Sequence, residues 1–379
     1  MRISCLQENL AHGLGIAGRA VSSRMALPIL SNILLATDDG RLRLSATNLE
    51  IAVTCWIGAK VEEEGAIAVP ARTFSDFVAT LPSAPLELAT DTETQTLRLQ
   101  SGRTKANFKG NSPEDFPERV QPNSEEVTEL DAARLREMIS QVAFAAAPDM
   151  ERPILGGVLF EFDGSTLSMV AADSFRLSVR RQNLERDMGG RRQIIVPARA
   201  LNEVARFAAE ATDPVQMIVL RDRSQVLFRV DDVELVSQLV EGLFPDFRQI
   251  MPRSYLTRTI LNTKELEAAV RRTSIIARGA NNTIRLQITA EENDEPSRMT
   301  VSAVAADLGD NVVDVDAMVE GDSLRIAFNA RYMSDLLDVI STENVLLETS
   351  SPASPGVFRP VGPEAQDFTH IIMPMYVPD

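Results

Sequence analysis

The sequence offers few of the side chains that bind metals or act as nucleophiles. Its 379 residues include two histidines, His12 and His370, and two cysteines, Cys5 and Cys55. The histidines are far apart and have no ligand partners nearby in the sequence, so we expect neither a histidine metal site nor a Cys-His dyad. Both cysteines stand among apolar residues, which predicts buried thiols in a reducing, cytoplasmic compartment. We therefore expect no bound metal, no cofactor and no catalytic histidine or cysteine, although counts alone leave carboxylate chemistry open, because the chain has 54 acidic side chains.

A glycine pattern near the amino terminus is typical of dinucleotide-binding enzymes. The segment 13–18 reads G-x-G-x-x-G, and Asp38 follows 20 residues after Gly18. No parallel strand-helix-strand pattern follows it, and no phosphate-binding G-x-x-x-x-G-K-[ST] occurs. We therefore expect these glycines to allow close packing of a helix. Three aspartates recur in the chain and fit turn hydrogen-bond acceptors better than metal ligands: Asp173, Asp246 and Asp307.

The elements that would position any functional residue are repeated three times. Residues 67–81, 194–208 and 326–340 each carry an Ala-Arg pair, at offsets of 127 and 132 residues. A third of the chain is about 126 residues, so the period covers the whole length. We expect three domains of one kind with these boundaries: 1–121, 122–255 and 256–379.

Each repeat shows two amphipathic helix patterns and several strand patterns. Apolar residues recur at i, i+3, i+4 and i+7, and Asp131 stands where an N-cap is expected. Alternating Val, Ile, Leu and Thr with Gly/Asp turns predicts antiparallel hairpins. The predicted fold is α+β, with two helices packed on antiparallel sheet in each copy. Open sheet edges would then remain at the chain ends, and a closed ring of chains is one way to cover them. The expected helices are 7–24, 71–81, 131–147, 198–210, 264–280 and 330–341.

Charge is unevenly distributed over this pattern. The chain has a net charge of −16, which argues against tight binding of nucleic acid or of anionic membranes, and no apolar run is long enough to span a bilayer. The six predicted helices carry 12 basic and 10 acidic side chains, a net charge of +2, whereas the rest carries −18. If the helices share one surface, that surface could follow a polyanion without gripping it. Ordinary solvated helix faces remain the alternative.

Several motifs, in register with the repeats, resemble the bacterial DNA polymerase III beta subunit (sliding clamp) family. They run from the first helix to the last strand of the chain. The motifs are residues 24–30 (RMALPIL), 47–50 (TNLE), 69–72 (VPAR), 172–177 (ADSFRL), 243–247 (LFPDF) and 373–375 (MPM).

The resemblance implies a DNA-clamp fold, in which two head-to-tail subunits form a ring around duplex DNA. It implies a replication processivity factor without enzymatic activity, whose contacts to DNA are independent of sequence. The implied partners are a clamp loader, replicative and translesion polymerases, ligase and mismatch-repair proteins. The arginines expected to face DNA are Arg24, Arg72, Arg199, Arg206, Arg271 and Arg278.

The resemblance also implies a hydrophobic pocket for linear peptides of partner proteins, in which Arg and Asn anchor polar groups. Its expected residues are Arg152, Leu155, Ala172, Ser174, Phe175, Arg176, Leu177, Pro245, Ile250, Asn329, Tyr332, Ile371, Met373, Pro374 and Met375. From strand periodicity alone, Leu155, Leu177 and Ile371 read as core residues.

Some residues differ from the family pattern. Ala172 and Ser174-Phe175 replace a Thr and a Gly-His, and the chain ends Tyr376-Val377-Pro378-Asp379 instead of with a basic residue and Leu. We expect Phe175 to make the groove floor larger and less polar. Two other functions remain open: a repeat-built interaction scaffold without a DNA role, and a carboxylate-dependent enzyme with an acidic pair in one repeat.

Overall fold

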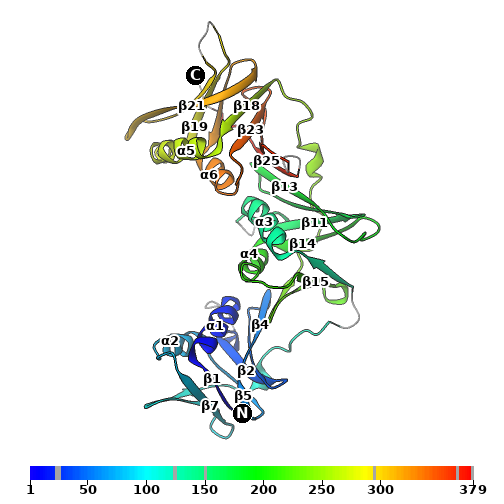
Figure 1. The fold of residues 1–379 in the computed structure, drawn as a ribbon, viewed down its shortest axis with the longest axis vertical. Helices are drawn as coiled ribbons and strands as arrows, with labels where there is room; N and C mark the ends of the chain where they lie inside the picture. Colours follow the sequence, from blue (N-terminus) through cyan, green and yellow to red (C-terminus); the bar gives the residue numbers. More distant parts are fainter. Residues whose placement is uncertain (22–26, 123–125, 149–151, 293–295, 364–366, 377–379) are drawn as a thin grey trace. The chain divides into compact units, whose positions relative to one another are not determined.

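The computed structural model describes residues 1–21, 27–122, 126–148, 152–292, 296–363 and 367–376 (Figure 1). The chain forms two compact units. Unit 1 comprises Met1–Arg136 and Arg199–Leu239, and unit 2 comprises Glu137–Ala198 and Val240–Asp379. The middle one of the three predicted domains thus contributes strands to both units, and its boundaries stay a prediction. None of the described helices is long and apolar enough to cross a membrane.

Unit 1 contains two antiparallel sheets. One sheet has five strands in the order β5-β1-β7-β8-β9, and the other has eight in the order β10-β15-β16-β17-β4-β3-β2-β6. Helices α1 (Gln7–Ala17) and α2 (Ala71–Ala79) pack against each other in this unit (Figure 1). Its strands are β1 (Arg2–Leu6), β2 (Asn32–Asp38), β3 (Arg41–Thr47), β4 (Ile51–Ile57), β5 (Lys60–Glu63), β6 (Ala66–Pro70), β7 (Pro85–Asp91), β8 (Thr96–Ser101), β9 (Thr104–Lys109), β10 (Val127–Leu130), β15 (Val215–Leu220), β16 (Gln225–Val230) and β17 (Val233–Gln238).

Unit 2 is built on one twelve-stranded sheet in the order β14-β11-β12-β13-β25-β24-β23-β18-β21-β20-β19-β22. Helices α5 (Thr263–Ala277) and α6 (Ala330–Leu337) pack together over its carboxy-terminal half (Figure 1). The strands are β11 (Gly157–Asp163), β12 (Thr166–Ala172), β13 (Arg176–Asn183), β14 (Arg192–Pro197), β18 (Thr257–Asn262), β19 (Thr283–Thr289), β20 (Arg298–Ala305), β21 (Gly309–Gly321), β22 (Leu324–Asn329), β23 (Asn344–Thr349), β24 (Gly356–Pro360) and β25 (Phe368–Ile372).

The six predicted helices are all present, and their apolar stripes are buried except for the half-buried Phe77 and Ala205. The remaining two are α3 (Ala132–Val142) and α4 (Ala198–Phe207). Asp131 caps α3 as predicted, because its Oδ1 accepts a hydrogen bond from the backbone N–H of Arg134 at 2.9 Å. The first helix was predicted too long: the α-helix ends at Ala17, a 3₁₀ turn follows over Gly18–Ala20, and Val21 is already extended.

The glycine pattern serves packing at one of its three positions. A Cβ on Gly13 would lie 2.5 Å from Leu44 Cδ1 and 2.9 Å from Ile57 Cγ2, so only glycine lets α1 lie this close to the sheet. Gly15 and Gly18 have open space around them. The two thiols are buried, as predicted, and burial raises the pKa of both to about 12.

In each unit, one strand pair joins two of the sequence repeats into a continuous sheet. The first joint is the pairing of β4 with β17 in unit 1, where Ala52 lies opposite Val236. The second joint is the pairing of β13 with β25 in unit 2, where Leu177 lies opposite Ile371. Most of the residues predicted to bind peptide lie at or near the second joint.

Candidate functional site

The second joint is shaped by a turn that precedes β13. Asp173 Oδ1 accepts hydrogen bonds from the backbone N–H groups of Phe175 and Arg176, at 2.7 and 2.9 Å. This local bonding is what favours Asp in such turns. The carbonyl of Phe175 then accepts a hydrogen bond from the N–H of Met373 at 2.8 Å. Phe175 and Met373, almost 200 residues apart in sequence, are thereby held side by side.

Arg176 ties the turn to helix α6 and to the segment after α3. Its Nε lies 3.0 Å from Asp173 Oδ2, and its Nη1 lies 2.5 Å from Asp335 Oδ2. Nη2 donates to the carbonyl of Phe144 at 2.7 Å, and the guanidinium lies 4.5 Å from the centre of the Tyr332 ring. The side chain is only 9% exposed. Arg176 is therefore a positioning residue whose donors are mostly used within the protein.

The floor beside this network is apolar. Ala172, Leu177 and Ile371 are buried in one cluster with Leu159 and Phe247. Phe247 belongs to the segment that follows Val240, and Phe244 and Met251 of that segment also pack against the cluster. Three residues predicted to bind peptide are thus brought together as the floor of the joint. Leu177 and Ile371 are core residues as well, which periodicity alone had indicated.

Exposed apolar and polar side chains border this floor. Phe175 is 56% exposed, and its ring stacks with that of Tyr332 at 6.4 Å between centroids. Ile250 and Met373 are 47% and 38% exposed. Arg152 Nη1 donates to Ser174 Oγ at 3.2 Å. Phe175 borders the floor, and its effect on the size and polarity of the floor stays a prediction.

The other predicted peptide-binding residues occupy varied positions. Asn329 is the N-cap of α6, where its Oδ1 accepts from the N–H of Arg331 at 2.9 Å, so part of its bonding capacity is already used. Met375 N–H donates to the carbonyl of Ala327 at 2.8 Å, and its Sδ lies 3.7 Å from Thr283 Oγ1. Leu155 and Pro374 are half-buried, and Pro245 is exposed. Their role in binding stays a prediction.

A buried histidine at the second joint was not foreseen as part of the site. His370 is opposite Ser178 in the strand pairing, and its Nδ1 lies 2.6 Å from Ser178 Oγ. Its ring is fully buried, with the Phe144 ring 5.2 Å away between centroids. Burial, with a smaller contribution from the nearby Arg176 charge, lowers the pKa of His370 to about 3. No pattern in the sequence marked this pair, because 192 residues separate the two.

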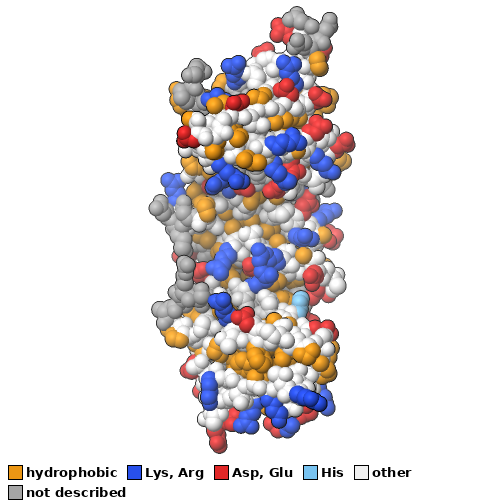
Figure 2. Space-filling view, turned by 90° about the vertical axis from the view of Figure 1, so that its left-hand side faces the viewer, with side chains coloured by type: hydrophobic (Ala, Val, Ile, Leu, Met, Phe, Trp, Pro, Cys, Tyr) orange, Lys and Arg blue, Asp and Glu red, His pale blue; other side chains and the backbone are white. Residues whose placement is uncertain are grey.

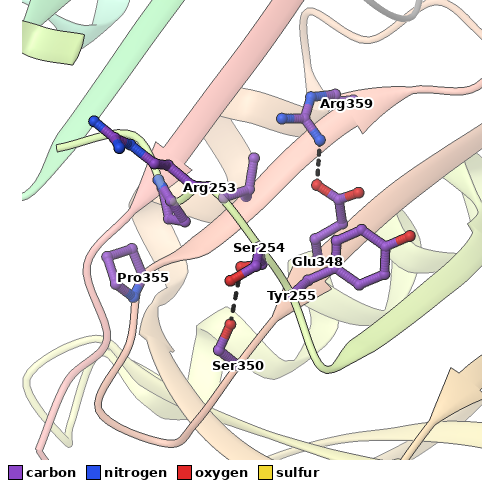
Figure 3. A pocket seen from close by; sticks show the side chains of 9 residues that line it. Arg253, Ser254, Tyr255, Glu348, Ser350, Pro355 and Arg359 are labelled. Carbon is purple, nitrogen blue, oxygen red and sulfur yellow. Dashed lines mark hydrogen bonds and ion pairs between the residues drawn. The ribbon is translucent and has the colours of Figure 1, made fainter. Parts of the chain in front are cut away.

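A cavity of about 210 Å³ adjoins the same apolar cluster through Val357. Figure 3 shows Arg359 directed to Glu348 and the hydroxyl of Ser350 directed to Ser254, whose carbonyl accepts its hydrogen bond at 3.2 Å. The cavity is mixed in polarity and includes none of the residues predicted to bind peptide. No sequence pattern predicted this cavity, because its walls come from segments about 100 residues apart.

The arginines predicted to face DNA are all exposed where the structure describes them. Arg72 lies on α2, Arg199 and Arg206 on α4, and Arg271 on α5 with Arg278 as its C-cap. Arg24 lies outside the described residues. On the face shown in Figure 2, Lys and Arg side chains stand among Asp and Glu side chains.

Nearby acids balance three of these arginines. Arg72 lies 3.8 Å from Asp76, Arg206 lies 3.5 Å from Glu203, and Arg271 lies 2.5 Å from Glu267. Arg199 and Arg278 make no ion pair within the described ranges. Exposed pairs of this kind are weak and exchange readily, so all five charges remain accessible to a phosphate backbone.

Comparison with known proteins assigns the fold to a class. The solved DNA polymerase sliding clamp of Bacillus subtilis superimposes with a TM-score of 0.93 and 26% identity, covering 100% of both chains. A Pseudomonas aeruginosa sliding clamp bound to griselimycin gives a TM-score of 0.91 and 27% identity, again over the full length of both. The architecture is that of a sliding clamp.

Sequence comparison gives the family. Models of the DNA polymerase III beta subunit match residues 1–120 (N-terminal domain), 129–246 (central domain) and 248–376 (C-terminal domain). The beta sliding clamp of Synechococcus elongatus is 32% identical over 379 residues, covering 99% of each chain, and that of Staphylococcus aureus is 31% identical over 94% of each. The chain belongs to the DNA polymerase III beta subunit family, as the sequence motifs predicted.

Proposed function

We propose that this protein is a DNA replication processivity factor that acts by binding and not by catalysis. Two copies would associate head to tail into a ring around duplex DNA, and peptide segments of polymerases and repair proteins would bind at the second joint. The observation that carries this proposal is family membership over the whole chain, supported by matches to all three domain models.

The helix arginines suit a protein that slides. Phosphate contacts hold a protein to DNA without reading its sequence, and more of them make binding tighter and more dependent on salt. Arg72, Arg206 and Arg271 are exposed but partly neutralised by neighbouring acids. We infer that such side chains guide the duplex, while closure of the ring prevents its escape.

Two free strand edges of opposite charge support a head-to-tail dimer. β9 is the last strand of the five-stranded sheet in unit 1 and exposes Lys105 and Lys109. In unit 2, residues 309–316 of β21 pair with β20 on one side and, within the described residues, with no strand on the other. This edge exposes Asp310 and Asp316. We propose that β9 of one subunit pairs with this edge of the other, which would cover both open edges.

Loading onto circular DNA tests ring closure. The protein is incubated with the clamp loader of its own replication system, ATP and nicked circular DNA, and the circle is then linearised. We expect retention on the circle and loss from the linear form, because only topology holds the protein. Equal retention on both forms would contradict the proposal.

Charge reversal tests the dimer edges separately. Lys105→Glu with Lys109→Glu should shift the protein from dimer to monomer in light scattering, because two acidic edges repel. Adding Asp310→Lys and Asp316→Lys to the same chain should restore the dimer. A dimer that is unaffected by the first pair of changes would exclude β9 as its interface.

Truncation of one floor residue and one border residue tests the peptide site. We expect Met373→Ala with Leu177→Ala to abolish binding of a polymerase-derived peptide in calorimetry, with the dimer intact. Tyr376→Ala, on an exposed side chain beyond the floor, serves as the matched control. Unchanged affinity of the double variant would refute the assignment.

A further inference from the structure

The first joint repeats the backbone geometry of the second joint bond for bond. Asn48 Oδ1 accepts from the N–H groups of Glu50 and Ile51, as Asp173 accepts from the two residues at the same positions of its turn. The carbonyl of Glu50 accepts from the N–H of Gln238 at 2.9 Å, the bond that Phe175 and Met373 make at 2.8 Å. Ala52 therefore takes the place of Leu177, and Val236 the place of Ile371.

The side chains at this equivalent position leave a hollow. Ala52 and Val236 are smaller than Leu177 and Ile371. At the first joint the segment 113–121 contributes Phe116 and Val120, and at the second joint Phe247 joins the apolar cluster. A cavity of about 730 Å³ results, lined by β2, β3, β4, β16, β17 and residues 113–121 of unit 1. Sites for small ligands and peptide side chains commonly have volumes of about 300–1,000 Å³.

Two buried polar atoms of side chains that line the cavity make no hydrogen bond within the described residues. Arg43 Nε and Gln225 Oε1 are buried and make no hydrogen bond within the described residues, although Arg43 lies 3.6 Å from Asp38. One is a donor and the other an acceptor. Arg43 is on β3 and Gln225 on β16, with β4 and β17 between them in the sheet. One ion could not contact both atoms, because two strands lie between them. An extended peptide, in contrast, carries donors and acceptors along its length.

The charge around the cavity restricts the ligand further. Arg43, Arg119 and Arg223 are balanced by three acids that line it: Glu50, Glu118 and Glu234. Glu234 is 4% exposed and is held by Arg119 at 2.7 Å and Arg229 at 2.8 Å. Since no charge is in excess, a neutral ligand fits better than an acidic or basic one.

We propose that the first joint is a second docking groove for a linear peptide of a partner protein. The peptide is neutral and extended, and places one bulky apolar side chain against Ala52 and Val236. Its backbone amides bond to Arg43 and Gln225. Leu49, 51% exposed on the rim with a φ of 72°, is held in a left-handed conformation that is costly for such a residue. This groove is separate from the peptide site of the proposed function, and neither needs the other.

The test uses the full-length protein with the second joint disabled by Leu177→Ala and Met373→Ala. A displayed library of random heptapeptides is selected against this protein, and enriched peptides are measured by calorimetry. We expect neutral peptides with one Leu, Ile or Phe. Ala52→Phe, which fills the hollow, should weaken them at least tenfold, and Gln225→Leu should weaken them about fivefold by removing one acceptor.

Controls keep the outcomes separate. Ala52→Leu copies the residue that the fold already accepts at the second joint, so it should fold normally and weaken binding by an intermediate factor. The proposal would be overturned if the enriched peptides bound the Ala52→Phe variant as tightly as the protein used for selection. It would also be overturned if no peptide were enriched. A change in the subunit state of Ala52→Phe would show instead that the groove is covered by another copy of the chain. Binding of the polymerase-derived peptide to the second joint is measured in the protein without Leu177→Ala and Met373→Ala. Failure of one site can then be told apart from failure of the other.

Discussion

The two joints have the same backbone and different chemistry. At the second joint, Arg176 bonds to Asp173, Asp335 and the Phe144 carbonyl, and Ser178 pairs with His370. The first joint has the buried Ile51 at the position of Arg176 and the apolar pair Val53 and Leu235 at the position of Ser178 and His370. A duplicated strand pairing therefore fixes the backbone of each joint, while the side chains decide whether the joint contains an arginine network.

Truncating the floor should separate the two joints most strongly. Leu177→Ala removes a side chain packed among Leu159, Phe247 and Ile371, and we expect it to lower the free energy of unfolding of unit 2 by about 3 kcal/mol. Val236→Ala, at the first joint beside an existing cavity, should cost unit 1 about 1 kcal/mol. Urea unfolding with hydrogen exchange at β13 and β17 measures each unit. Equal costs would mean that the two floors are packed alike.

Removing the arginine network should have the next largest effect. Arg176→Ile places at the second joint the residue type that Ile51 has at the first. We expect this change to lower the free energy of unfolding by about 2 kcal/mol, because Asp173 loses its cationic partner while the more exposed Asp335 regains water. Asp335→Asn is the matched control and should cost less than half as much. Urea unfolding at neutral pH checks both variants. A stabilised Arg176→Ile variant would show that the network serves binding and not stability.

Acid should weaken the second joint through His370, whose position at the first joint is taken by the apolar Leu235. The pKa of His370 is about 3 in the folded protein, against an ordinary 6.5, so the unfolded chain binds the extra proton first. The stability that depends on neutral His370 is fully present above pH 6.5 and is lost as the pH falls toward 3. By pH 5 the free energy of unfolding should have fallen by about 2 kcal/mol. His370→Leu with Ser178→Val, the pair type of the first joint, should remove this part of the pH dependence. An unchanged pH profile would show that His370 is charged or accessible in the native state.

The smallest expected effect lies in the two turns. Leu49 has a φ of 72°, whereas Ser174, its counterpart, does not have a positive φ. Leu49→Gly should therefore raise stability slightly, by about 0.5 kcal/mol, because relief of strain exceeds the entropy cost of glycine. Ser174→Gly should lower stability by a similar amount, since it adds the entropy cost of glycine and relieves no backbone strain. Thermal unfolding resolves the sign, and a shift in the same direction for both would contradict this account.

The helices and their buried faces were predicted from local sequence patterns. The stripes beginning at Leu10, Leu135 and Leu266 are buried, and Asp131 caps its helix. These features depend on neighbours within a few residues, which a sequence displays directly. The first helix was predicted to continue beyond Ala17 because the stripe alone does not mark where a helix ends.

The site was predicted through family motifs and not from pattern. Leu177 and Ile371 look like ordinary strand residues until β13 pairs with β25, and the Ser178–His370 pair and the cavity at Ala52 have no sequence signature. The predicted peptide-binding and DNA-facing roles remain to be tested, although the structure gathers the first group around one joint.

Periodicity and internal repetition were enough to predict the threefold repeat, the helices with their buried faces and the burial of both cysteines, and six short motifs were enough to recognise the clamp family. Tertiary structure alone decided that the middle repeat is shared between two compact units. It also decided that equivalent joints contain an arginine network in one case and a hollow in the other. Strand pairing over almost 200 residues and the volume left between side chains are properties of the packed chain, which no local pattern records.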